Sequence, residues 1–302
     1  MRVADLFYAE KPFPSLEIVP PLGGISKEEL LSGIEPLMEF RPRYINVTTH
    51  RDEYQYVAQP DGSFSRVVVN SRVSPVAVCA SILSRFDVEV VPHLVCGGQT
   101  AHDTERLLQD FQFMGIENVM ALRGDSVSGE KRFVATPGGY SHASELVAAV
   151  RAEGNFCIGV GGYPEKHYEA PNLDTDIAFL KQKVDAGADY IITQMFFDNA
   201  VFFRFVDLCR AAGITVPIIP GLKPLTTKSQ LAFLPDAFSL DIPVELTEQI
   251  AACGEDAEAI RRAGVDWCIR QTRELLGSGV PAVHYYTMSK SAAVAAVLRE
   301  CF

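Results

Sequence analysis

Eight short apolar segments, each followed by a segment of helical periodicity, constrain the fold of this chain more than any other feature. The apolar segments are expected to be buried on both faces, as in a parallel sheet covered by helices. Eight strands close a barrel, and we therefore predict an α/β fold of the (β/α)8 TIM-barrel type, with a doubly wound open sheet as the alternative. The predicted strands are 16–19, 44–48, 88–94, 119–122, 157–160, 190–194, 216–220 and 283–286.

Local signals set the helices between these strands. Ser26 is suited to cap a helix beginning at Lys27, proline at position 75 suits a first helical turn, and Gly115 suits a helix end. The segment 49–74 is predicted as a long polar loop, and 243–277 as an additional, mostly helical segment before the last strand. Because nothing resembles a domain linker, we expect residues 1–302 to form one catalytic domain.

Composition and charge exclude several classes of partner. The net charge of −11 argues against nucleic acid or an anionic membrane as the main partner. The seven cysteines are scattered singly, which favours reduced thiols over a disulfide framework or a metal site. No apolar stretch approaches the ~18 residues that cross a bilayer, and the first residues do not resemble a signal peptide. We therefore expect a cytoplasmic protein without a metal.

Polar residues recur where the predicted strands end, which is where TIM barrels carry their chemistry. Glu17 lies within an apolar strand, so burial is expected to raise the pKa of its carboxyl group and make it a candidate general acid; an ion-paired filler of the barrel is the alternative. Gln194 lies among apolar neighbours, where its amide needs a partner such as a heteroaromatic ring. Further strand-end candidates are Thr48, His93, Asp125, Tyr163, His167, Tyr286 and Thr287.

Phosphate-binding signals are weaker. The run Gly159-Val160-Gly161-Gly162 lacks the third glycine of a dinucleotide fingerprint and is followed by Pro164, so we reject a Rossmann motif. Arg123, His167 and Lys183 are candidates to hold a phosphate in loops of the barrel. For Lys183 alone, solvated surface charge is an equally good interpretation.

Over almost its whole length the chain resembles the methylenetetrahydrofolate reductase family. The resemblance is carried by segments that occur in the family's order: LEIVPP at 16–21, PHL at 92–94, ALRGD at 121–125, GYPEKH at 162–167, KVDAGAD at 183–189, ITQMFFD at 192–198, IIPG at 218–221 and HYYT at 284–287. One such segment would be modest evidence, and this many in order is strong evidence.

The resemblance implies an FAD-dependent enzyme that reduces 5,10-methylenetetrahydrofolate to 5-methyltetrahydrofolate for methionine synthesis. NADH or NADPH would deliver hydride to flavin N5 and leave before the folate binds. By matching position, Glu17 would be the general acid, and Asp125 would lie near both flavin and pterin. Gln194, Gln230 and Lys290 match substrate-binding positions. The positions that match FAD contacts are Thr48, His93, Leu122, Arg123, Gly124, Asp125, Tyr163, His167, Asp176 and Lys183.

Some positions depart from the family. Leu234 stands where some bacterial members have a phenylalanine that orders the nicotinamide donor, and Tyr140 or His142 stands where a flavin-contacting tyrosine is often found. Because the chain ends after the eighth helix, we expect no S-adenosylmethionine-binding regulatory domain. We expect a homo-oligomer.

Two other functions compete with the reductase. One is a flavin-free, pterin-dependent one-carbon transferase on the same barrel, and the other is a non-catalytic barrel subunit of an electron-transfer complex. The presence of Glu17, Asp125 and Gln194 together favours an enzyme, because a structural subunit has little use for a desolvated acid.

Overall fold

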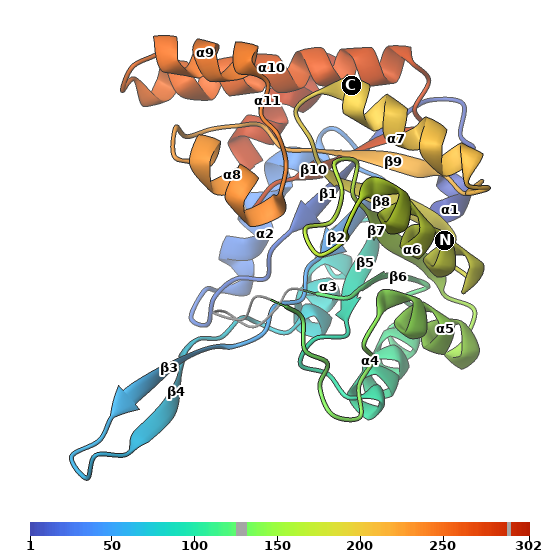
Figure 1. The fold of residues 1–302 in the computed structure, drawn as a ribbon, viewed down its shortest axis with the longest axis vertical. Coiled ribbons are helices and arrows are strands. Elements are labelled where there is room, and N and C mark those ends of the chain that lie inside the picture. The colour runs from blue at the N-terminus through green and yellow to red at the C-terminus, as the bar shows by residue number, and fades with distance from the viewer. Residues whose placement is uncertain (125–131, 289–290) are drawn as a thin grey trace.

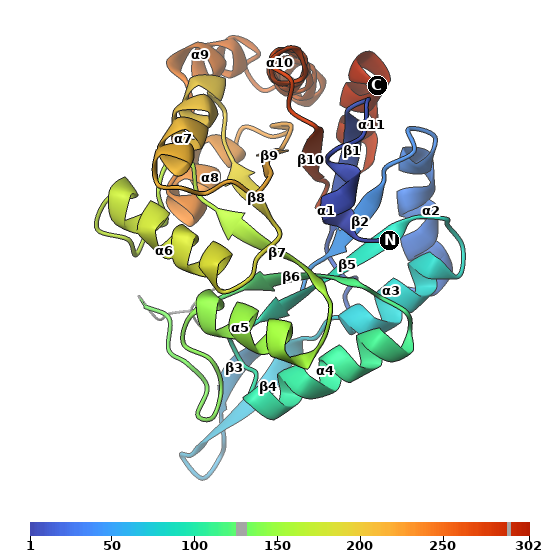
Figure 2. The ribbon, with the colours of Figure 1, turned by 90° about the vertical axis from the view of Figure 1, so that its right-hand side faces the viewer.

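The computed structural model describes residues 1–124, 132–288 and 291–302. Eight parallel strands close into a barrel in the order β1-β10-β9-β8-β7-β6-β5-β2, surrounded by helices (Figures 1 and 2), which confirms the predicted (β/α)8 fold over the open sheet. The strands are β1 (Phe13–Ile18), β2 (Tyr44–Val47), β5 (Glu89–Val95), β6 (Asn118–Leu122), β7 (Cys157–Gly162), β8 (Tyr190–Met195), β9 (Ile218–Leu222) and β10 (Ala282–Tyr286).

Most of the outer helices begin and end close to their predicted positions. They are α2 (Lys27–Met38), α3 (Pro75–Leu83), α4 (Ala101–Phe113), α5 (Ala143–Glu153), α6 (Leu173–Asp185), α7 (Asn199–Ala211) and α11 (Ser291–Cys301). The Ser26 hydroxyl accepts the Glu29 backbone N–H at the start of α2, and Gly115 follows α4 at φ 75°, where a side chain would be strained.

Packed side chains close the N-terminal end of the barrel. The short helix α1 (Val3–Leu6), which the sequence analysis did not anticipate, lies there, and its Val3 and Leu6 join an apolar cluster with the ring of Tyr190. A Cβ atom on Gly159 would lie 2.5 Å from that ring, so this glycine makes room for an interior tyrosine. The glycine run on β7 therefore has a packing reason, in agreement with the rejection of a dinucleotide motif.

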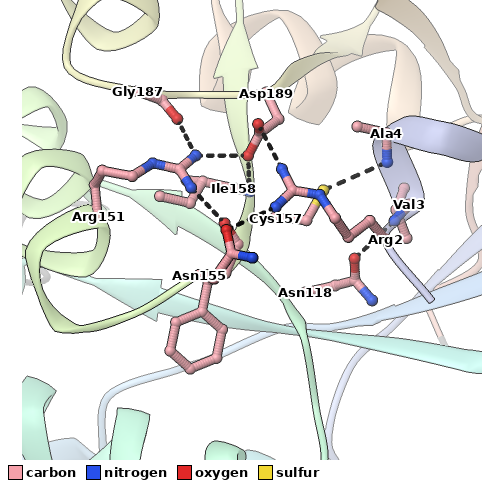
Figure 3. Close-up of polar contacts among 11 residues, drawn as sticks. Arg2, Val3, Ala4, Asn118, Arg151, Asn155, Cys157, Ile158, Gly187 and Asp189 are labelled. Carbon is pink, nitrogen blue, oxygen red and sulfur yellow. Dashed lines mark hydrogen bonds and ion pairs between the residues drawn. The ribbon is translucent and has the colours of Figure 1, made fainter.

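Hydrogen bonds and ion pairs hold the first residues of the chain to the outside of this end of the barrel (Figure 3). The Asp189 carboxylate pairs with Arg2 at 2.9 Å and with Arg151 at 2.7 Å, and it accepts the Ile158 backbone N–H at 2.8 Å. The Asn118 side chain accepts the Val3 N–H at 2.7 Å. These bonds join the first residues of the chain to β6, β7 and the start of β8.

An additional layer lies between β9 and β10, as predicted for residues 243–277. It consists of α8 (Gln230–Phe238), α9 (Val244–Ala252) and α10 (Ala257–Gly277), packed over an apolar cluster that includes Met195 and Leu234. The Trp267 indole donates to the Phe197 carbonyl at 2.9 Å. The layer thus braces the chain just beyond the end of β8.

The segment 49–74 is not a plain loop, and this expectation was wrong. It contains a two-stranded antiparallel hairpin, β3 (Glu53–Ala58) and β4 (Phe64–Asn70), which projects from the barrel in Figures 1 and 2. All six residues of β3 are exposed. Because neither face is buried, the segment lacks the buried apolar pattern by which the barrel strands were recognised.

Candidate active site

The C-terminal ends of the strands bring polar side chains together around Glu17. This residue stands one position before the end of β1 and aligns with Asn46 on β2 and Tyr286 on β10. Its backbone carbonyl accepts the Thr287 hydroxyl at 2.7 Å and the Thr287 N–H at 3.2 Å. The carboxyl group is therefore held on a fixed strand end with 15 % of its side chain exposed.

Two histidines flank the Glu17 carboxyl group. Its Oε2 lies 3.6 Å from Nε2 of His93 and 3.8 Å from Nε2 of His284. Burial alone would raise the pKa of Glu17, but its interactions with the imidazoles of His284 and His93 outweigh burial, and the pKa is lowered. The expected raised pKa is thus wrong, because the ends of two strands far along the chain place histidines beside Glu17.

His93 is held in its neutral form. Burial lowers its pKa to about 4, although the charge of Glu17 acts in the opposite direction. Its Nε2 lies 3.1 Å from the Asn46 amide nitrogen, and its backbone carbonyl accepts the Thr49 hydroxyl at 2.5 Å. Thr48, buried beside them, contacts His50 at 2.9 Å.

A second group of predicted residues gathers over the ends of β6 and β7. Arg123 pairs with Glu169, lies 3.5 Å from His167, and stacks on the ring of Phe133 with 4.9 Å to the centroid. Burial and the charge of Arg123 lower the pKa of His167 to about 4. The ring of Tyr163 meets His167 edge-on at 4.7 Å.

Lys183 and Asp176 complete this group. The Lys183 ammonium donates to the Gly161 carbonyl at 2.7 Å, and burial together with the charge of Arg123 lowers its pKa to about 8. The Asp176 carboxylate accepts the His167 backbone N–H at 2.9 Å, and burial raises its pKa. The positive charge of Arg123 thus lowers the pKa of both Lys183 and His167, whereas the carboxylates of Asp176 and Glu169 act in the opposite direction.

Two further predicted residues, Leu122 and Gly124, lie at the end of β6. Leu122 is half-buried, and Gly124 adopts φ 81°, where a Cβ atom would also come within 3.3 Å of Val95. Asp125 and Lys290, predicted to act on the substrate, lie outside the described residues.

Gln194 lies at an irregularity in β8. The pairing with β9 shifts between Ile192 and Met195, and bulges of this kind redirect a side chain next to a site. The Gln194 amide oxygen accepts the Met195 backbone N–H at 2.9 Å. Its amide nitrogen is therefore the group left to donate to a ligand.

Gln230 has a similar arrangement at the start of α8. Its amide oxygen accepts the backbone N–H groups of Thr226 and Thr227 at 2.7 and 3.0 Å. Since these backbone donors fix the position of the oxygen, Gln230 also presents an amide nitrogen. The two predicted substrate-binding glutamines are thus both donors.

Several polar residues near Glu17 were not among those predicted from the sequence. Ser15 lies 2.9 Å from Nδ1 of His284, and Asn46 bonds His93, all fully buried inside the barrel. A period of two was the available signal, because Ser15 precedes Glu17 by two and His284 precedes Tyr286 by two, so each pair shares a strand face.

No cluster of histidine, cysteine and acidic side chains among the described residues is arranged to hold a metal ion. No helix within those same residues is long and apolar enough to cross a membrane.

Comparison with known proteins identifies consistent relatives. Residues 2–301 match the profile of a family described as methylenetetrahydrofolate reductase. The chain is 32 % identical to methylenetetrahydrofolate reductase (NADH) 1 of Arabidopsis thaliana, covering 91 % of this chain and 46 % of the relative. It is 31 % identical to the 5,10-methylenetetrahydrofolate reductase of Escherichia coli K12, covering 92 % of this chain and 86 % of that one.

Solved structures share the fold. A Clostridium thermocellum protein that binds two copies of 5-methyl-5,6,7,8-tetrahydrofolic acid superposes with a TM-score of 0.69 at 15 % identity, covering 100 % of this chain and 98 % of that one. The chain spans about half the length of the first eukaryotic relatives that it matches.

Proposed function

Because the chain belongs to the methylenetetrahydrofolate reductase family, we propose that it reduces 5,10-methylenetetrahydrofolate to 5-methyltetrahydrofolate with bound FAD and a nicotinamide donor, and that the donor and the folate occupy the barrel mouth in turn. The observation that carries this proposal is the Glu17 carboxyl group, buried at the mouth between His93 and His284. Such an acid has no evident purpose in a purely structural barrel.

The residues at the mouth fit the proposed cofactor. Arg123, which is paired with Glu169, and Lys183, which feels the charge of Asp176, are both half-buried. The pKa of Lys183 is lowered by burial and by the charge of Arg123, and an anionic diphosphate would relieve that repulsion. Thr48, His93, Tyr163, His167 and Asp176 would hold the remaining parts. Bound FAD would supply the hydride carrier between the donor and the folate.

Glu17 would protonate the folate so that its five-membered ring opens. The pKa of Glu17 is lowered by the neighbouring histidines, so the carboxylate must first take up a proton. A bound pterin would displace the remaining solvent from the carboxyl group and raise its pKa toward that of a usable acid. The amide nitrogens of Gln194 and Gln230 would orient the pterin, and Asp125 would stabilise a cationic intermediate of the folate.

An anaerobic absorbance spectrum tests the redox part of the proposal. Purified protein incubated with FAD is expected to show a flavin band that bleaches with NADH or NADPH and returns when methylenetetrahydrofolate is added; the faster donor is the preferred one. No band after incubation with FAD would favour the flavin-free transferase. A band that stays oxidised with both donors would point to a partner protein as the electron source.

Glu17→Gln tests the acid separately. The variant is expected to retain reduction by the nicotinamide donor and to lose folate reduction by about 10²- to 10⁴-fold, the usual contribution of a general acid. Glu28→Gln, at an exposed position on α2, is the matched control and should retain both steps. Equal losses in both steps would remove Glu17 from this role.

A further inference from the structure

The β3–β4 hairpin stands apart from the barrel (Figures 1 and 2). It is a two-stranded sheet, and no other helix or strand of the described chain packs extensively against it. It is joined to the body near its base, where the Gly23 N–H donates to the Ser71 carbonyl at 3.0 Å. An isolated two-stranded hairpin is marginally stable in water, so this arm would gain from being covered.

One face of the hairpin is rich in aromatic residues. The cross-strand pairs place five large side chains on this face, which we call the aromatic face: Tyr54, Tyr56, Phe64, Arg66 and Val68. Tyr56 and Phe64 are 67 % and 68 % exposed, and Tyr54 is 45 % exposed. Tyrosine, phenylalanine and arginine are among the residues enriched at protein–protein interfaces.

We propose that the aromatic face is a dimerisation surface, on which the hairpins of two copies of this chain pack face to face about a two-fold axis. The face is complementary to itself, since it carries both a cation and the rings that attract it. Within one copy the Arg66 guanidinium already lies over the Tyr54 ring, 4.2 Å from its centroid. Tyr56 is the direct cross-strand partner of Arg66, so a two-fold axis through this pair brings each guanidinium to the other copy's rings.

The area of the face agrees with a weak, specific dimer. With these exposures and ~150–250 Å² for each aromatic side chain, the face offers on the order of 500 Å² per copy. A symmetric pair would bury on the order of 1,000 Å², the lower end for specific interfaces. The dimer is therefore expected to dissociate on dilution.

Charge favours a second copy over a membrane. The chain carries a net charge of −11, whereas residues 53–70 contain only Glu53, Asp61 and Arg66 as charged groups. Contact through this nearly neutral arm keeps two acidic bodies apart. The tip of the hairpin, 59–63, is polar and includes Asp61, which opposes insertion of the tip into a bilayer.

Sedimentation velocity over a range of protein concentrations tests the dimer. The wild type is expected to shift from one copy toward two as the concentration rises, and added salt should not weaken the association because it screens the repulsion between acidic bodies. If other surfaces build a larger assembly, Tyr56→Glu should halve its mass. A wild type that stays monomeric at every concentration, or an assembly unchanged by Tyr56→Glu, would overturn the proposal.

Further variants distinguish an effect of the hairpin on association from a general effect of added surface charge. Tyr8→Glu makes the same change at a tyrosine that is 80 % exposed near α1 and should leave the association unchanged. Phe64→Ala adds no charge and should weaken association on the order of tenfold. Hydrogen exchange of the β4 amides in the wild type should slow as the protein is concentrated, and exchange independent of concentration would contradict the proposal.

Discussion

At the scale of single residues, the buried histidine beside Glu17 makes the protein sensitive to acid. His93 is 5 % exposed, and its pKa falls from an ordinary 6.5 to about 4. Between these values the unfolded chain binds a proton that the folded protein does not, so the free energy of unfolding decreases as the pH falls through this window, by on the order of 3 kcal/mol. Glu17, whose pKa is lowered, also loses its contribution as the pH falls through its folded pKa.

His93→Gln is expected to remove most of the histidine contribution. Urea denaturation of both proteins at pH 7 and pH 4.5 measures it: the wild type should lose more stability between the two pH values than the variant does. His167, whose pKa is also about 4, remains in both proteins, so it cancels in the comparison. Equal losses would show that His93 is not held neutral by burial.

The amide of Gln194 permits a second prediction. Its oxygen is bonded to the Met195 N–H, so Gln194→Glu keeps that bond and replaces the free amide donor with a carboxylate. Affinity for the folate is expected to fall about tenfold through loss of one donor, with unchanged reduction by the nicotinamide donor. Equilibrium binding of 5-methyltetrahydrofolate checks it, with Gln182→Glu on the exposed side of α6 as the control; equal affinities for wild type and variant would exclude the contact.

Single residues also mark the limit of sequence reasoning at the site. Glu17 was found as an acid on an apolar strand, because its immediate neighbours are visible in the sequence. The direction of its pKa was not, because His284 and His93 come from strands far along the chain. The burial of a residue can be predicted from its neighbours in the sequence. The groups that interact with a buried charge depend on which strands become neighbours in the fold.

At the scale of elements, the barrel units were predictable and the hairpin was not. Helix caps such as Ser26 and terminators such as Gly115 act within a few residues, so most helices begin and end close to their predicted positions. Asp61-Gly62 between two valine- and aromatic-containing runs was the overlooked hairpin signal. Its strands are exposed on both faces, so no buried pattern accompanied that turn signal.

Two glycines within helices, Gly264 and Gly33, are expected to respond to alanine substitution in opposite ways. A Cβ atom on Gly264 of α10 would lie 1.8 Å from the Leu225 carbonyl oxygen, whereas one on Gly33 of α2 would meet nothing within 4 Å. Alanine improves helix propensity by up to ~1 kcal/mol at either site, but overpacking at Gly264 costs ~1–3 kcal/mol. Gly264→Ala should therefore lower the free energy of unfolding and Gly33→Ala should raise it, as measured by urea denaturation; stabilisation by both would show that α10 shifts freely.

At the scale of the whole molecule, the two ends of the barrel differ in their effect on stability. The C-terminal mouth gathers Glu17, His93, Arg123 and Lys183, and there the burial that lowers the pKa of Lys183 is a cost to stability. The N-terminal end gathers α1 and the bonds of Asp189, which join segments far apart in the sequence (Figure 3). The packing and ion pairs at the N-terminal end thus offset the free-energy cost of burying polar groups at the C-terminal mouth.

Asp189→Ala tests this division between the ends. The substitution leaves Arg2 and Arg151 without their shared carboxylate and the Ile158 N–H without its acceptor, so the free energy of unfolding should fall by on the order of 3 kcal/mol. Glu255→Ala removes an exposed ion pair with Lys228 and should cost at most ~1 kcal/mol. Urea denaturation gives both values, and FAD titration of the folded variant should give the wild-type affinity. A weakened affinity in folded Asp189→Ala would mean that the two ends are coupled through the strands, because the side-chain bonds of Asp189 to described residues go to Arg2, Arg151 and Ile158.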